Sequence, residues 1–211
     1  MRKVSEAVPA LQFGLHHRLL NLSQVARFIC PLVEARVHKS VQPSAVLMSL
    51  SRLQRRWENQ QPALQRRFRV DRINVQGGLC ALTLPKQLAT LRELAELFGR
   101  VQQEGGYLTL TEGVSEVTVI LEQRHMALIP QVLHVIPRRV YRNLAGLGVK
   151  FQERYLETPG LLYQLLQQLA LQNINVVEVA STTTEFNIYL DDRDVQLAFD
   201  SIYNRFVREV S

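Results

Sequence analysis

The chain has 211 residues, of which 46% are hydrophobic and 21% are charged, so it can build one or two packed domains, or three small ones. No apolar run approaches the roughly 20 residues that cross a bilayer, and the start MRKVSEAVPALQ lacks the apolar centre of a signal peptide. We therefore expect a cytoplasmic protein with no membrane partner. Cys30 and Cys80 form no CxxC pair, which favours two small buried side chains over a disulfide or zinc site.

The net charge of +6 is spread unevenly along the chain. Residues 1–69 hold twelve Lys or Arg against three Glu, a balance of +9, which leaves −3 for the remainder. A basic N-terminal part favours a polyanion or an acidic protein surface as its partner, whereas the mildly acidic remainder does not.

Three helices are predicted in residues 1–66. The first opens at Pro9 and runs to residue 20, and the second follows a turn in which Ser23 is the N-cap. The third opens at Gln42-Pro43-Ser44. The second helix should face the core with its apolar positions, which are Val25, Phe28, Ile29, Leu32, Val33 and Val37.

This layout resembles a helix-turn-helix or winged-helix domain, and a hairpin over residues 69–84 would be its wing if it packed under these helices. On the third helix Arg52, Arg55 and Arg56 project away from the apolar stripe, where a recognition helix needs donors for phosphates and guanine edges. DNA is then the partner of the basic domain. The alternative is that the arginines are a solvated face of a small helical dimerisation domain.

A β-α-β-β-α pattern follows. It consists of a strand, a helix closed by Gly105-Gly106, two strands and a short helix, at residues 79–84, 86–103, 107–111, 116–121 and 123–133. The apolar side of its long helix is Leu88, Leu91, Leu94, Phe98 and Val101. A strand at residues 69–75 could extend a sheet or belong to the N-terminal domain, and residues 135–144 form a bridging strand broken by Pro137.

The same order recurs in residues 147–199. Val149 and Phe151 alternate as in a strand, and Thr158-Pro159-Gly160 opens a helix whose stripe is Leu161, Leu165 and Leu169. Asn173 ends that helix. Two alternating strands joined by the turn 181–184 come next, and Asp191 with Asp192 caps a last helix.

Four sequence segments resemble the ACT domain, in the version found in the regulatory half of aspartate kinases. They are TPGLLYQLL, NINVVEV, STTTEFNIYLDD and DVQLAFDSI. The resemblance covers about residues 144–211. It implies a ferredoxin-like module that binds an amino acid or similar small metabolite and pairs with other such modules, and hence a homodimer or higher homo-oligomer. It does not imply a kinase, because the chain is too short for that catalytic domain and lacks a Gly-rich phosphate loop.

The expected fold class is α+β. A three-helix, winged-helix-like domain (1–66) precedes a divergent first ACT-like domain (67–134) and a second, aspartate-kinase-like one (135–211). The first copy is inferred because the segment TEGVSEVTVIL is similar to STTTEFNIYL, and this similarity aligns Glu116 with Glu185.

A ligand carboxylate suits free amides at a helix start, which here is formed by Glu157, Thr158, Gly160 and Leu161. The resemblance implies a second polar cluster at Asn173, Ile174, Asn175, Ser181 and Thr182. In related regulatory domains the pocket forms where two lobes meet, so Asn175 can face a partner lobe rather than Gly160 of its own. The alternative is that these segments are simply a helix opening, a cap and a turn.

No enzyme and no cofactor are expected. The five histidines lack metal-ligand spacing, and nucleophile elbows and phosphate loops are absent from the sequence. We expect an amino-acid-responsive regulator whose basic domain can bind DNA. Two alternatives stay open, namely a regulatory subunit or adaptor that docks on an enzyme or another regulator through its basic domain, and an ACT unit that has lost its ligand and survives as an assembly module.

Overall fold

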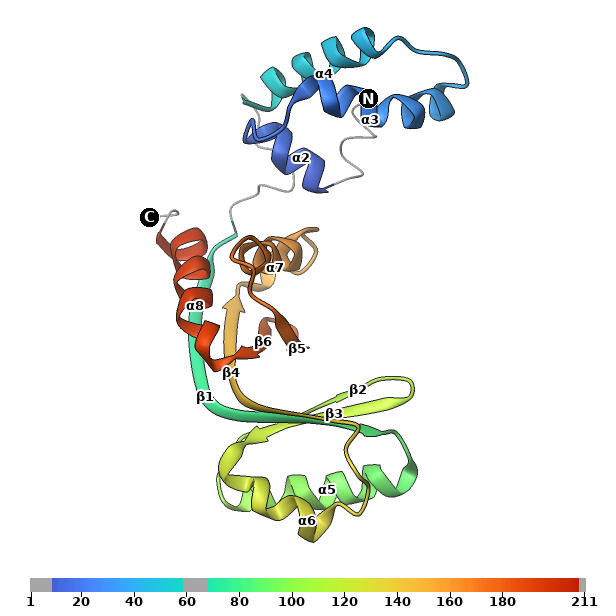
Figure 1. Cartoon of the computed structure of the whole chain (residues 1–211). Coiled ribbons are helices and arrows are strands. Elements are labelled where there is room, and N and C mark those ends of the chain that lie inside the picture. The colour runs from blue at the N-terminus through green and yellow to red at the C-terminus, as the bar shows by residue number, and fades with distance from the viewer. Residues whose placement is uncertain (1–8, 59–67, 209–211) are drawn as a thin grey trace. The chain divides into compact units, whose positions relative to one another are not determined.

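The computed structural model describes residues 9–58 and 68–208 (Figure 1). The chain divides into two compact units, Met1–Arg66 and Arg67–Ser211. The predicted border between the helical and ACT-like parts, at residues 66 and 67, falls outside the described residues. Among the described helices none is both long and apolar enough to span a bilayer.

The first unit contains α2 (Pro9–His16), α3 (Leu22–Val37) and α4 (Pro43–Glu58). Its core gathers apolar side chains from all three helices, namely Leu15, Val25, Ala26, Ile29, Cys30, Val33, Val46, Leu50 and Leu53. The predicted three-helix content is therefore found.

Two helix boundaries differ from prediction. The first helix ends at His16 rather than at residue 20, because Arg18 takes a left-handed conformation (φ 55°) and ends the regular turn. The N-cap of α3 is Asn21 rather than Ser23. The side-chain oxygen of Asn21 accepts hydrogen bonds from the backbone N–H of Ser23 (3.0 Å) and Gln24 (3.3 Å), so Ser23 already lies in the first turn.

The inward face of α3 is narrower than predicted. Phe28 is 74% exposed, Leu32 51% and Val37 43%, so these three are not core residues. Val25, Ile29 and Val33 are buried instead, because the other described helices of the first unit pack against the side of α3 that carries them.

The second unit is built on one antiparallel sheet with the strand order β2-β3-β1-β4-β6-β5. Its strands are β1 (Val70–Pro85), β2 (Leu108–Glu112), β3 (Glu116–Glu122), β4 (Arg139–Phe151), β5 (Val176–Ser181) and β6 (Glu185–Asp191). The long central strands β1 and β4 run through both halves of this sheet and curl between them (Figure 1).

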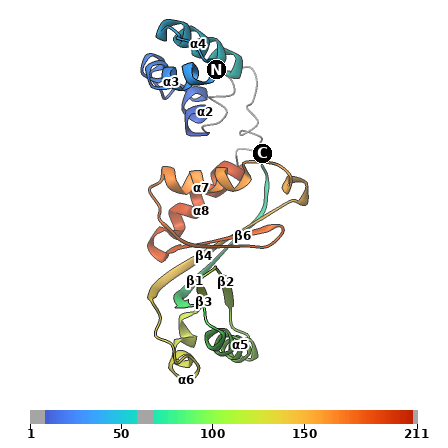
Figure 2. The ribbon, with the colours of Figure 1, turned by 90° about the vertical axis from the view of Figure 1, so that its right-hand side faces the viewer.

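Helices cover one face of each half (Figure 2). On the first half lie α5 (Leu88–Gln103), the 3₁₀ turn η2 (Gln123–Leu128) and α6 (Ile129–Val132). The second half carries α7 (Leu161–Leu171) and α8 (Val195–Tyr203). Three further single-turn elements are η3 (Glu153–Tyr155), η4 (Asp192–Asp194) and η5 (Asn204–Arg208).

The central strands complete both halves. Residues 70–76 of β1 pair with residues 146–151 of β4 and so supply a fourth strand to the second half. Residues 139–144 of β4 do the same for the first half. The strand at residues 69–75, whose place the sequence leaves open, thus extends the sheet of the second half.

The predicted wing is wrong. Residues 70–85 form one continuous strand of the second unit rather than a hairpin. Gly77-Gly78 has the composition of a turn, but β1 passes through it with a register shift between Gln76 and Leu79 and a left-handed Gly78 (φ 68°). The glycines therefore bend a strand instead of reversing it.

The apolar stripe of α5 is also rotated from its predicted position. Leu88 is 67% exposed and Phe98 43%, whereas Thr90, Leu94, Leu97 and Val101 are buried. Both assignments have helical spacing, so periodicity alone does not decide between them.

The helix-free faces of the two halves meet inside the curl. Leu79, Ala81, Ile120, Leu144 and Tyr189 form a small buried cluster there, separate from the two cores under the helices. The two halves are thereby joined by side chains as well as by β1 and β4.

Candidate functional site

The start of α7 is shaped by a short turn before it. The backbone N–H of Thr158 donates to the carbonyl of Tyr155 (2.9 Å), and Gly160 adopts a left-handed conformation (φ 98°) as N-cap. A side chain would be strained at that φ, which accounts for the glycine. The first-turn amides of a helix have no acceptor inside it, so α7 presents free N–H groups next to Gly160.

The turn between β5 and β6 lies against this helix start. It is closed by a hydrogen bond from the backbone N–H of Thr182 to the carbonyl of Glu185 (2.9 Å). A second bond, from the N–H of Phe151 to the carbonyl of Thr184 (3.0 Å), ties the turn to the end of β4. The turn hydroxyls are thus held beside the segment that leads into α7.

The two segments enclose a pocket of about 390 Å³. Five of the nine predicted ligand residues line it, namely Thr158, Gly160, Leu161, Ser181 and Thr182. The other lining residues are Phe151, Tyr155, Leu156, Leu162, Tyr163, Thr183 and Phe186. Residues 151–163 and residues 181–186, which α7 and β5 separate in the sequence, therefore meet at one opening.

The remaining four predicted residues do not line this pocket. Glu157 is exposed between two lining residues, and Asn173, Ile174 and Asn175 lie at the opposite end of α7. Asn173 is left-handed (φ 57°), and the N–H of the buried Ile174 donates to the carbonyl of Leu169 (3.0 Å). Within one copy of the chain these two residues serve to end the helix.

The pocket has aromatic and aliphatic walls, hydroxyl groups at its rim and no charged side chain in its lining. Burial raises the pKa of the Tyr163 phenol, which accepts a hydrogen bond from Nε2 of Gln167 (3.0 Å). This phenol is therefore neutral at physiological pH. A ligand carboxylate would be bound by helix amides, and an ammonium by hydroxyl and carbonyl oxygens.

The sequence does not predict the aromatic walls. Its alternation places Phe151 and Phe186 in strand cores, and no motif singles out Tyr155 or Tyr163. The sequence indicates Tyr163 as a pocket residue only by its position, because it follows Gly160 by three residues and so lies in the first turn of the helix.

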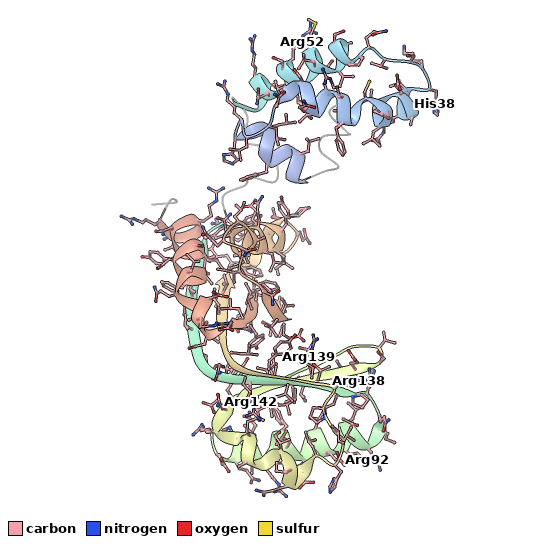
Figure 3. The ribbon with its side chains drawn as sticks, in the orientation of Figure 1. His38, Arg52, Arg92, Arg138, Arg139 and Arg142 are labelled. Atoms are coloured by element: carbon pink, nitrogen blue, oxygen red, sulfur yellow. The ribbon has the colours of Figure 1, made fainter. Side chains whose placement is uncertain are left out.

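On α4, Arg52, Arg55 and Arg56 are all exposed, as predicted from the apolar stripe. Figure 3 shows Arg52 projecting on the side of α4 away from α3. Among the side chains that the structure describes, none of the three has an acidic partner.

No group of three or more His, Cys, Asp or Glu residues that could bind a metal ion occurs in residues 9–58 and 68–208. Of the histidines, His134 contacts Glu93 (Nδ1 to Oε1, 3.0 Å), and the buried His125 lies 3.1 Å from Oε2 of Glu104. Both contacts link elements of the first half of the sheet.

The architecture is that of the ACT-type regulatory domains of aspartate kinase, a mixed α and β fold around a curled antiparallel sheet. No protein-family model and no curated protein matches the chain. The likeness is found among solved structures, and at the identities below it is a likeness of fold.

Aspartate kinase from Clostridium acetobutylicum, described as an allosteric enzyme, is 16% identical with a TM-score of 0.55, and the match covers 65% of this chain and 35% of that one. The regulatory subunit of aspartate kinase from Thermus thermophilus is 13% identical with a TM-score of 0.52, covering 67% and 99%. Aspartokinase III from E. coli, solved with aspartate and ADP, is 13% identical with a TM-score of 0.51, covering 67% and 34%. The chain thus spans about a third of the whole kinases and nearly all of the regulatory subunit.

Proposed function

We propose that this chain is a cytoplasmic, non-enzymatic regulator that senses an amino acid or a similar small metabolite through two ACT-like units. The observation that carries the proposal is the pocket in which Thr158, Gly160 and Leu161 of the α7 start meet Ser181 and Thr182 of the β5–β6 turn. The resemblance of the sequence and the likeness of fold support the same function.

In this proposal the free amides of the first turn of α7 bind the ligand carboxylate, since a helix N-terminus carries partial positive charge. Gly160 leaves the backbone open to close approach. The hydroxyls of Thr158, Ser181 and Thr182 accept hydrogen bonds from the ligand ammonium. The aromatic walls favour an apolar ligand side chain, because no charged group lines the pocket to pair with a charged one.

A second copy would complete the site. Strands β2 and β5 are the outer strands of the sheet and leave one row of backbone groups each without a strand partner. Pairing along these edges would give a dimer or higher oligomer. Glu157, Asn173, Ile174 and Asn175 would then contribute to ligand binding from an adjacent copy rather than from their own.

Ligand binding would change how the ACT-like units, or lobes, are arranged relative to one another. A ligand shifts a balance between two arrangements only by its difference in affinity for them. In the proposed mechanism the bound state stabilises one lobe arrangement and so changes how the basic N-terminal units are presented to their target.

A screen of thermal stability tests this function. The twenty amino acids and common nucleotides would be added one at a time to the full-length protein, and a ligand at 100 times its Kd should stabilise it by about 2.7 kcal/mol. Leu162→Trp should abolish the shift, because it enlarges an exposed pocket residue without disturbing the core. Leu171→Trp, a similarly exposed leucine at the far end of α7, is the matched control.

If no compound stabilises the protein, the ligand-sensing function is wrong and the assembly-module alternative is favoured. If Leu162→Trp and Leu171→Trp respond like the parent, a ligand binds elsewhere on the chain.

The target of the N-terminal unit is proposed separately. Three exposed arginines on one helix, without acidic partners among the described side chains, favour an anionic target. We propose DNA as this target, with an acidic surface of an enzyme or another regulator as the alternative.

A further inference from the structure

A second recess of about 430 Å³ lies on the helix-free face of the sheet, away from the pocket at α7. It is built on β1, β4 and β6, which are neighbours in the sheet (Figure 1). The strand register sets the residues of this face in three cross-strand rows, which are Arg72, Lys150 and Glu185, then Asn74, Gly148 and Asn187, then Gln76, Gly146 and Tyr189. All of them except Lys150 line the recess.

These rows lie on the face opposite the core. The residues that alternate with them, such as Leu147, Val149 and Ile188, are buried under α7 and α8. Since side chains alternate between the two faces of a strand, the three rows face the inside of the curl.

Two glycines form the floor of the recess. A Cβ atom added to Gly148 would lie 2.5 Å from Oδ1 of Asn74 and 2.9 Å from Oδ1 of Asn187, so both amide groups lie close to the backbone of this residue. At Gly146 an added Cβ would approach the side chains of Leu79 and Tyr189 to 3.3 Å. Glycine weakens the interior of a strand, and such positions often mark a close approach by another molecule.

The polar groups of the recess have capacity for further hydrogen bonds. Within the described residues the side-chain amides of Asn74, Gln76 and Asn187 have no hydrogen-bond partner. The guanidinium of Arg72 lies 3.9 Å from Oε1 of Glu185, and Nζ of Lys150 lies 3.7 Å from the same oxygen. These long contacts leave both a cation and an anion available to a ligand.

The recess changes character along its length. One end carries Arg72 and Glu185, the middle carries the two asparagine amides, and the other end is formed by Leu79, Tyr107 and Tyr189 with the amide of Gln76. Residues 72 and 76 are about 13 Å apart along an extended strand. A molecule with both charges at one end and a large apolar group at the other matches this order.

We propose that this recess binds a zwitterionic α-amino acid with a large apolar or aromatic side chain, at a site separate from the pocket at α7. The ligand carboxylate would pair with Arg72, its ammonium with Glu185, and its side chain would lie against Leu79 and the two tyrosines. The size of the recess favours large side chains over small ones.

Such a ligand would touch both halves of the second unit. Tyr107 and Leu79 belong to the first half, whereas Asn187 and Tyr189 belong to the second. A molecule that contacts both sides of the curl binds some curvatures of β1 and β4 better than others, and so can shift their populations. The site would thereby act on the relation between the two halves.

Calorimetric titration of the full-length protein tests the site. The probes are L-phenylalanine, L-tyrosine, L-tryptophan and L-leucine, with N-acetyl-L-phenylalanine and L-phenylalaninamide as analogues that lack one charge each. We expect at least one amino acid to bind, and each analogue to bind at least about tenfold more weakly, as for the loss of one charge-assisted hydrogen bond.

Gly148→Ala should abolish this binding, because its methyl group fills the floor between the asparagines. Only the ends of flexible side chains must move aside, so the fold should survive. Gly99→Ala on α5, where an added Cβ meets nothing within 4 Å, is the matched control and should bind as the parent does.

Charge-removing variants make the test independent of Gly148. Arg72→Gln should weaken the amino acid but leave the affinity for the amide analogue unchanged, and Glu185→Gln should do the same for the N-acetyl analogue. Both side chains are exposed enough, at 66% and 41%, for the fold to tolerate the change.

The proposal is overturned if none of the four amino acids binds, or if Gly148→Ala and the two charge variants bind like the parent. Loss of binding in Leu162→Trp alone would also overturn it, while supporting the pocket at α7. Loss in Gly148→Ala with retention in Leu162→Trp supports the recess.

Discussion

The hydroxyl oxygens of Tyr107 and Tyr189 lie 2.5 Å apart and join the two halves of the second unit across the inside of the curl. Tyr107 precedes β2 in the first half, and Tyr189 is on β6 in the second. Tyr189 is only 1% exposed, and burial raises its pKa, as does the hydrogen bond with Tyr107. Tyr189 is therefore a neutral phenol that depends on Tyr107 for its hydrogen bond.

This dependence predicts an asymmetry between two substitutions. Tyr107→Phe leaves the buried hydroxyl of Tyr189 without a partner and should cost about 1–3 kcal/mol of unfolding free energy. Tyr189→Phe leaves the hydroxyl of the more exposed Tyr107, which can bond to water instead, and should cost about 1 kcal/mol or less. Urea unfolding of both variants measures the difference, and equal costs would contradict this role of burial.

Asp191 is predicted to stabilise the folded state in a pH-dependent way. Its carboxylate accepts hydrogen bonds from the backbone and guanidinium of Arg193 (2.8–3.1 Å), which lowers its pKa to about 2. A lowered pKa in the folded state stabilises the fold above the unfolded pKa of about 4, and this stabilisation is lost as the pH falls towards 2.

Asp191→Asn should therefore lower the urea midpoint at pH 6, and the difference from the parent should shrink between pH 4 and pH 2. Asp192→Asn removes the same charge one residue later and serves as control. A difference that stays constant with pH would show that the Asp191–Arg193 ion pair contributes nothing.

Thiol reactivity should be low in the native protein. Burial raises the pKa of Cys80 to about 11, and Cys30 is buried with its thiol donating to the carbonyl of Val41 (3.3 Å). Since the thiolate is the reactive form, neither residue should react with Ellman's reagent at pH 8 on the time scale of minutes, whereas both should react in denaturant. A rapidly labelled thiol in the native protein would contradict the burial of these residues.

The three exposed arginines of α4 predict how the affinity for DNA depends on salt concentration. If this face binds DNA, changing Arg52, Arg55 and Arg56 to Gln should flatten the plot of log affinity against log salt by about 0.9 for each DNA phosphate that α4 no longer binds. The control removes three exposed arginines of the second unit, Arg92, Arg139 and Arg142 (Figure 3). Equal losses of affinity in both triple variants would exclude a specific role for α4.

If the parent does not bind DNA at low salt, and the α4 variant loses a protein partner in a pull-down, the docking-subunit alternative is favoured. If neither property changes, the three arginines are a solvated face.

The open edges of the sheet predict self-association. β2 and β5 each have a strand neighbour on one side only. Light scattering at micromolar concentration should therefore give a mass of at least twice the 24.2 kDa of one chain. A mass of 24.2 kDa would contradict the proposed pairing of lobes.

Local patterns predict much of the second unit. Alternation at Val149 and Phe151 and the leucine stripe of α7 depend on neighbours in sequence, and both are confirmed. The predicted cap of the last helix is found one turn early, because Asp191 caps the 3₁₀ turn η4, whereas the N-cap of α8 is Asp194. The repeat is also supported in detail, because the hairpins at Gly113–Glu116 and Thr182–Glu185 close with the same backbone hydrogen bond of 2.9 Å.

The features that the sequence does not predict depend on distant partners. Gly77-Gly78 reads as a hairpin turn, and only pairing with β4 makes it a bend within one strand. Phe28 and Leu32 follow helical spacing, but periodicity does not tell which face of α3 has a neighbour. The tyrosine walls of the α7 pocket and the rows of the second recess likewise arise only when separate segments meet.

The most direct test of ligand sensing is hydrogen exchange of the full-length protein, with and without the amino acid that stabilises it most in the thermal screen. We expect slowed exchange at residues 158–163 and 181–184, where the start of α7 meets the β5–β6 turn. Slowed exchange at residues 72–76, 146–148 and 185–189 would instead locate the ligand in the recess on the helix-free face. Unchanged exchange at residues 158–163 and 181–184 with a saturating, stabilising ligand would contradict a binding site at the start of α7.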